Sequence, residues 1–83
     1  MKLFDDCCNY IDSWFDAFNK LGETGNNVFE ALMKTYALKV EEKMSEIENA
    51  GLGNMFYNEA NEKYGYTFNN INFINKRQDT RLL

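Results

Sequence analysis

Residues 27–50 read NVFEALMKTYALKVEEKMSEIENA, and this stretch decides the fold that we expect for the chain. Apolar side chains recur in it at spacings of three and four residues, which places them on one face of an amphipathic helix. They are Phe29, Leu32, Met33, Tyr36, Ala37, Val40, Met44 and Ile47. A lone helix of this length is marginal in water, because helices in proteins are stabilised mainly by packing their apolar faces. Another part of the chain must therefore cover this face.

Both ends of this helix carry residues that favour helix termini. We expect Asn27 to cap the first amides, with Glu30 reaching back in a capping box. At the other end, Gly51 is expected to adopt the left-handed conformation, and Leu52 to complete a Schellman motif.

A second helix, predicted over residues 3–21 from the same apolar spacing, is the natural partner for this face. Gly22 is its expected C-cap, and the short loop 22–26 makes the two helices antiparallel neighbours. We expect the space between them to bury Phe15, Phe18, Phe29, Met33, Tyr36 and Val40.

The apolar arc of residues 3–21 is wider than one helix–helix contact requires. Leu3, Cys7, Tyr10, Trp14 and Ala17 are predicted to project beyond the surface that residues 27–50 can cover. We expect the third helix and the tail to cover part of this surface and another chain to cover the rest, so a homodimer is one alternative.

A shorter third helix is predicted over residues 54–64, with Asn54 as its cap and Gly65 at its end. Residues 66–83 leave two alternatives open, a small β-hairpin or a weak fourth helix. Residues 75–83 are expected to be a frayed tail. The fold class is therefore all-α: an antiparallel helical hairpin closed by a short helix, in one domain of 83 residues.

Composition removes several classes of chemistry. The chain has no His, which is the commonest general base and metal ligand. Cys7 and Cys8 are adjacent and match neither a redox nor a zinc spacing. Asp12 and Asp16 share a helix face, but a polar one that would not separate their pKa values. We therefore predict no catalytic residue, no metal site and no cofactor.

We expect no signal peptide, and no apolar run is long enough to span a membrane. A cytoplasmic location is therefore expected. Asn, Lys, Phe, Tyr, Met and Ile are abundant, and their codons are rich in A and T. This composition points to a phage, a mobile element or a low-GC bacterium; if the gene is phage-encoded, the protein would act in the host cytoplasm.

Charge is distributed unevenly along this acidic chain, whose net charge is −4. Residues 1–65 hold twelve acidic and six basic residues, whereas residues 66–83 hold one acidic and three basic residues. The candidate contacts to a protein partner are Asp5, Tyr10, Asp12, Trp14, Asp16, Leu38, Glu42 and Glu46. The candidate nucleic-acid contacts in the tail are Lys76, Arg77 and Arg81.

These features predict a small, non-enzymatic protein that binds another protein. The sharper hypothesis is a phage or mobile-element inhibitor of a host factor, such as a defence nuclease. The first alternative is a self-assembling structural component that forms a homo-oligomeric bundle. The second is a nucleic-acid-binding module that uses the basic tail, which the acidic remainder of the chain disfavours.

Overall fold

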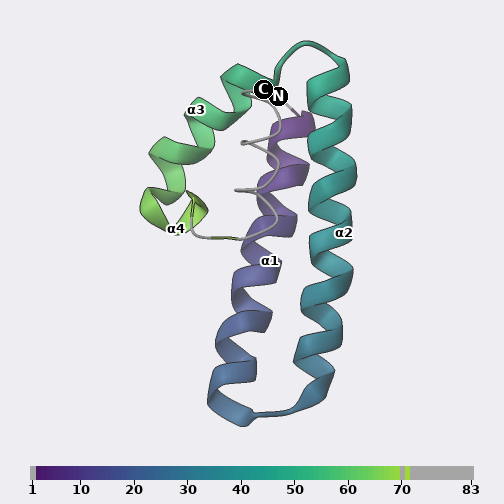
Figure 1. The fold of residues 1–83 in the computed structure, drawn as a ribbon, viewed down its shortest axis with the longest axis vertical. Coiled ribbons are helices and arrows are strands. Elements are labelled where there is room, and N and C mark those ends of the chain that lie inside the picture. The colour runs from purple at the N-terminus through teal and green to yellow at the C-terminus, as the bar shows by residue number, and fades with distance from the viewer. Residues whose placement is uncertain (1, 70, 72–83) are drawn as a thin grey trace.

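The computed structural model describes residues 2–69 and 71, with Tyr66 and Asn69 described by their backbone alone. Four helices follow one another in this part of the chain (Figure 1): α1 (Lys2–Thr24), α2 (Asn27–Asn49), α3 (Gly53–Tyr64) and α4 (Tyr66–Asn69). No strand occurs among the described residues. α1 and α2 form an antiparallel hairpin, and α3 lies against one half of it. The predicted all-α hairpin with a short third helix is therefore confirmed.

The connection between α1 and α2 is shorter than predicted. α1 continues through Gly22 to Thr24, so the expected C-cap at Gly22 is wrong. Gly25 is the residue that adopts a positive φ, at 66°. The Thr24 hydroxyl donates to the Lys20 carbonyl at 2.8 Å and accepts from the Asn26 amide at 3.1 Å. These two bonds support the last turn of α1 and the turn that follows it.

The N-cap of α2 is Asn26 and not Asn27. Asn26 has an extended conformation, and its side-chain oxygen accepts a hydrogen bond from the Val28 amide at 3.0 Å. Its own amide is bound by Thr24, which fixes Asn26 outside the helix and leaves Asn27 as the first helical residue. Between the two adjacent asparagines of this chain, the bond to Thr24 favours Asn26 as the cap.

The C-terminus of α2 is the predicted Schellman motif. Gly51 has a φ of 77° and its amide donates to the Glu48 carbonyl at 3.0 Å. The Leu52 amide donates to the Ile47 carbonyl, also at 3.0 Å. These are the two hydrogen bonds that define the motif, and they turn the chain towards α3.

α3 begins one residue earlier than predicted, at Gly53, and its N-cap residue, Leu52, makes no side-chain capping bond. Asn54 therefore lies inside the helix and does not cap it. Gly65 ends α3 as expected, with a φ of 62°. Residues 66–69 then form a helical turn, which overturns the β-hairpin alternative for this segment. Apart from Ile71, the rest of residues 66–83, including the tail at 75–83, lies outside the described residues.

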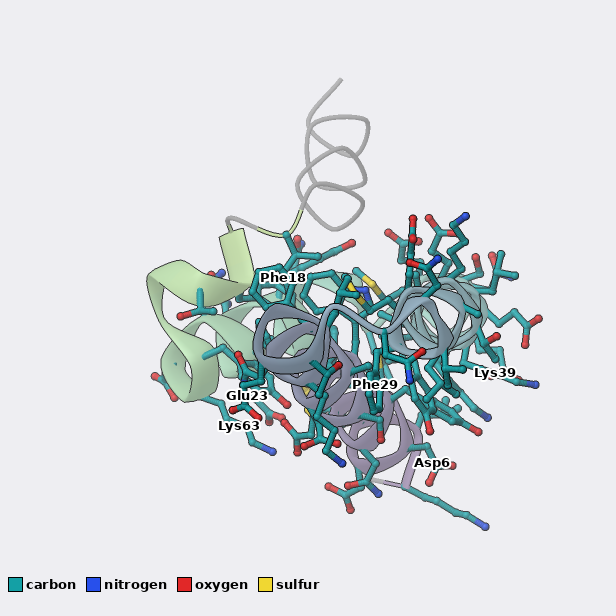
Figure 2. The ribbon with its side chains drawn as sticks, turned by 90° about the horizontal axis from the view of Figure 1, so that it is seen from below. Asp6, Phe18, Glu23, Phe29, Lys39 and Lys63 are labelled. Atoms are coloured by element: carbon teal, nitrogen blue, oxygen red, sulfur yellow. The ribbon has the colours of Figure 1, made fainter. Side chains whose placement is uncertain are left out.

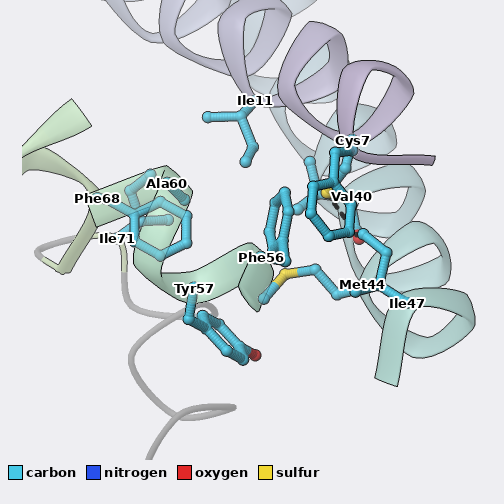
Figure 3. Close-up of a cluster of buried hydrophobic side chains, with 11 residues drawn as sticks. Cys7, Ile11, Val40, Met44, Ile47, Phe56, Tyr57, Ala60, Phe68 and Ile71 are labelled. Carbon is cyan, nitrogen blue, oxygen red and sulfur yellow. Dashed lines mark hydrogen bonds between the residues drawn. The ribbon is translucent and has the colours of Figure 1, made fainter. Parts of the chain in front are cut away.

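The core lies where α3 packs on the hairpin. Its members come from all four helices and from Ile71, and Figure 3 shows many of them meeting around Phe56. The Phe56 ring lies 5.2 Å from Phe4 of α1 and 6.5 Å from Phe68 of α4, both edge-on. The buried cluster consists of Phe4, Cys7, Ile11, Val40, Met44, Ile47, Phe56, Tyr57, Ala60, Phe68 and Ile71.

The other half of the hairpin has almost no buried side chain. Of residues 12–39, which we call the distal half, Ala17 alone is buried. α3 has 12 residues and is therefore about 18 Å long, roughly half the length of α1 or α2. It runs from Phe4, which packs on Phe56, to Phe15, which packs on Tyr64, and ends there.

The predicted core is therefore only partly correct. Val40 is fully buried, but Phe15, Phe29, Met33 and Tyr36 are half-buried. The predicted burial of Phe18 is wrong: this residue is 52% exposed, because it lies one turn of α1 beyond the end of α3. Cys7 and Ala17, which were expected to project beyond α2, are buried, whereas Leu3, Tyr10 and Trp14 are half-buried against the core.

Candidate functional site

The distal half presents apolar side chains on both sides of the hairpin. On one side, the rings of Trp14 and Phe18 stack with centroids 5.6 Å apart and an interplanar angle of 16°. Phe15 lies edge-on to Trp14 at 5.4 Å. We call Trp14, Phe15 and Phe18 the aromatic face. Since Phe18 remains half-exposed after this stacking, the aromatic face has uncovered ring surface.

An open groove of about 390 Å³ lies on another side of the hairpin, between α1 and α2. Figure 2 shows Phe29 between the two long helices, on a different side from Phe18. Phe29, Leu32 and Tyr36 of α2 form an apolar wall of the groove. The opposite wall comes from α1 and is mostly polar: Asp12, Ser13, Asp16, Ala17 and Lys20. The groove thus joins an apolar wall to a wall that carries two carboxylates.

Both carboxylates of the groove have partners within the chain. Asp16 forms an exposed ion pair with Lys20 at 3.0 Å, and the Lys20 ammonium lies 6.0 Å from the centre of the Phe29 ring. Asp12 accepts a hydrogen bond from the Tyr64 hydroxyl at 2.7 Å and lies 4.0 Å from the Lys63 ammonium. The end of α3 therefore fixes one acidic group of the groove.

Tyr64 is the side chain that joins the end of α3 to α1. Its hydroxyl lies 2.7 Å from Asp12 Oδ1 and 3.1 Å from the Cys8 carbonyl oxygen. Burial, together with the hydrogen bond to Asp12, raises the pKa of this hydroxyl above its usual value. Tyr64 is thus a neutral donor at every physiological pH.

The thiols are not arranged for nucleophilic chemistry. Burial raises the pKa of the Cys8 thiol, which favours the unreactive protonated form at neutral pH. Cys7 is fully buried, and its sulfur lies 4.0 Å from the Val40 carbonyl oxygen of α2. Within the described ranges, no group of three or more Cys, Asp or Glu side chains is placed to hold a metal ion.

The structure brings together only some of the residues predicted to contact a partner. Asp12 and Asp16 line the groove, and Trp14 belongs to the aromatic face. Leu38 is 61% exposed on α2. The remaining candidates are in the other half of the hairpin, where Tyr10 is half-buried and Asp5, Glu42 and Glu46 are exposed. Lys76, Arg77 and Arg81 lie outside the described residues.

Sequence reasoning missed the exposure of Phe18, Val28 and Leu32, which all lie in the distal half. One signal for it was present in the sequence. A third helix of 11 predicted residues cannot cover two helices of about twice its length, so one half of the hairpin had to remain open.

Comparison of the chain with family models, with curated proteins and with solved structures gives no match. None of the helices in the described part of the chain is both long and apolar enough to cross a membrane.

Proposed function

We propose that this protein acts by binding another protein through the distal half of its hairpin, without catalysing a reaction. The observation that carries the proposal is the contrast in burial along the hairpin. Residues 12–39 bury Ala17 alone, while Phe18, Val28 and Leu32 are 52%, 59% and 37% exposed. Exposed apolar surface bordered by charged residues is typical of protein interaction sites.

The composition of this surface supports the proposal. Burying a Phe, Val or Leu side chain fully contributes about 1.5–3 kcal/mol relative to leaving it in water. Trp and Tyr are enriched among residues that dominate binding energy, and Trp14 and Tyr36 border the exposed groups. A partner that covers the distal half would remove several of these side chains from water together.

A non-enzymatic role is supported by the state of the reactive groups. The Cys8 thiol has a raised pKa, and the Tyr64 hydroxyl is held by Asp12. Asp12 and Asp16 are exposed, so water screens both carboxylates.

The test compares two variants, Phe18→Ser and Met55→Ser, whose parent side chains are equally exposed. Phe18 on α1 and Met55 on α3 are both 52% exposed, but only Phe18 belongs to the distal half. Photo-crosslinkers placed at positions 18 and 32 would capture a partner. The purified partner would then be titrated calorimetrically with the wild type and with each variant. We expect Phe18→Ser to weaken binding about tenfold or more, as for an interface anchor, and Met55→Ser to leave it unchanged.

Three outcomes separate this proposal from its alternatives. A partner released equally by both variants, or by neither, would contradict binding through the distal half. A dimer in light scattering that Phe18→Ser dissociates would identify the partner as a second copy. Tight binding of DNA or RNA at low salt, abolished when Lys76, Arg77 and Arg81 are changed to Ala, would replace the proposal with nucleic-acid binding.

A further inference from the structure

We infer that the groove of the distal half receives an arginine side chain from a basic segment of the partner. This inference rests on the proposed function, because it names the chemistry of the surface that the distal half would bind. Three features of the groove lead to it: its two unlike walls, the position of Lys20, and the charge around it.

The two walls match the two parts of a long basic side chain. Such side chains bury an apolar stem and keep a charged head next to polar groups. Phe29, Leu32 and Tyr36 supply an apolar wall of the groove, and Asp12 and Asp16 lie on the facing wall. The volume of about 390 Å³ is near the lower end of the range for small-ligand pockets, about 300–1,000 Å³. The groove is therefore large enough to admit a long side chain.

Lys20 already places a cation in this position. Its ammonium is 3.0 Å from an Asp16 oxygen and 6.0 Å from the centre of the Phe29 ring. A cation held between a carboxylate and an aromatic ring thus fits the groove. The pair between Lys20 and Asp16 is exposed and contributes little to stability, so an incoming cation can replace Lys20 at little cost.

The surrounding charge favours a cation over an anion. Residues 1–65 contain twelve acidic and six basic residues, so a basic partner surface is attracted and an acidic one is repelled. Asp12 is held by the Tyr64 hydroxyl and lies 4.0 Å from the exposed Lys63 ammonium, and neither contact removes its charge. Arginine suits the site better than lysine, because its planar group can stack on Phe29 and bind a carboxylate through two hydrogen bonds.

The test is an NMR titration of the full chain with N-acetyl-arginine amide. N-acetyl-citrulline amide has nearly the same shape without the charge, and N-acetyl-norleucine amide supplies the apolar stem alone. We expect the arginine probe at tens of millimolar to shift the amides of Asp16, Lys20 and Leu32. It should bind about fivefold more tightly than citrulline, the upper limit for an exposed ion pair.

Variants of exposed residues assign the effect to the groove. Asp16→Asn should weaken the arginine probe about fivefold, and Lys20→Gln should leave its affinity equal or higher. Glu42→Gln removes an exposed carboxylate outside the groove and serves as the matched control. Equal binding of arginine and citrulline, no shifts at all, or an unchanged affinity in Asp16→Asn would each overturn the inference.

The two proposals fail independently. If the arginine probe does not bind but Phe18→Ser still releases a captured partner, the distal half binds protein without an arginine in the groove. If the probe binds but no partner depends on Phe18, the groove recognises cations and the proposed function is wrong.

Discussion

Val40 lies at the boundary between the two halves of the hairpin and is completely buried. Val40→Asp would bury an unpaired carboxylate, and we expect it to unfold the protein or to cost about 3–5 kcal/mol. The matched control is Val28→Asp, since Val28 is exposed in the first turn of α2. That change should alter the stability by no more than about 1 kcal/mol, because a carboxylate near a helix N-terminus is favourable.

Circular dichroism melts of the two valine variants make the comparison. A melting temperature near that of the wild type in Val40→Asp would contradict the packing of α1 against α2. Equal damage in Val28→Asp would mean that the distal half is covered in solution, which is the state expected of an oligomer.

The Tyr64 hydroxyl gives the stability a defined pH dependence. Its pKa is raised in the folded state from an ordinary value of 10.0, so the folded protein holds this proton more tightly than the unfolded chain. The stability from this group is therefore complete below pH 10.0 and is lost as the pH rises above it. The loss is at most about 1.4 kcal/mol per pH unit, and solvent screening of the partly exposed hydroxyl reduces it.

Tyr64→Phe tests this dependence through urea unfolding at several pH values. At pH 7 the variant should be less stable by about 1–2 kcal/mol, because the hydrogen bond to Asp12 is lost. Above pH 10 its stability should decline less steeply than that of the wild type, so the two curves converge. Parallel curves would mean that the hydroxyl does not hold its proton more tightly in the folded state.

At the scale of single elements, the end of α2 depends on the backbone conformation of Gly51. Gly51 and Gly22 both have open space where a Cβ would be placed, but Gly51 has a φ of 77° and Gly22 lies within α1. We expect Gly51→Ala to cost about 1 kcal/mol through strain in the left-handed region. Gly22→Ala should stabilise the protein by about 0.5–1 kcal/mol, because Ala favours the helix.

Chemical unfolding of the two alanine variants measures the change in the free energy of unfolding, which we expect to have opposite signs in the two. Since neither new methyl group meets a neighbour, the difference between them reports the backbone alone. A stabilised Gly51→Ala would show that the chain leaves α2 by a different turn.

The helix ends also show how much of the fold the sequence determines. The Schellman motif at Gly51 and Leu52 was predictable because its hydrogen bonds are local. Two other choices were not predictable: which of Asn26 and Asn27 caps α2, and which of Gly22 and Gly25 ends α1. Each pair offers two chemically equivalent residues, and between the asparagines the bond of the Thr24 hydroxyl to the Asn26 amide favours Asn26.

At the scale of the whole molecule, the candidate site was less predictable than the fold. Apolar spacing identified Phe18 and Val40 as members of the same hairpin interior, yet one is exposed and the other buried. Periodicity gives the direction in which a side chain points from its helix axis. It does not tell whether a third helix extends far enough along the hairpin to cover that side chain. The groove, likewise, requires the register of Asp16 against Phe29 across two helices.

The contrast between the two halves predicts a gradient of local stability along the hairpin. Hydrogen exchange followed by NMR should show that amides within the helical turns of residues 13–36 exchange through local opening, because few buried contacts oppose it. Amides around Val40, Met44 and Phe56 should exchange only through global unfolding, because their side chains form the core. A captured partner should raise protection mainly in the distal half, with Phe18→Ser as the control variant. Uniform protection of both halves in the isolated monomer would contradict an open distal half and remove the basis for placing the binding surface there.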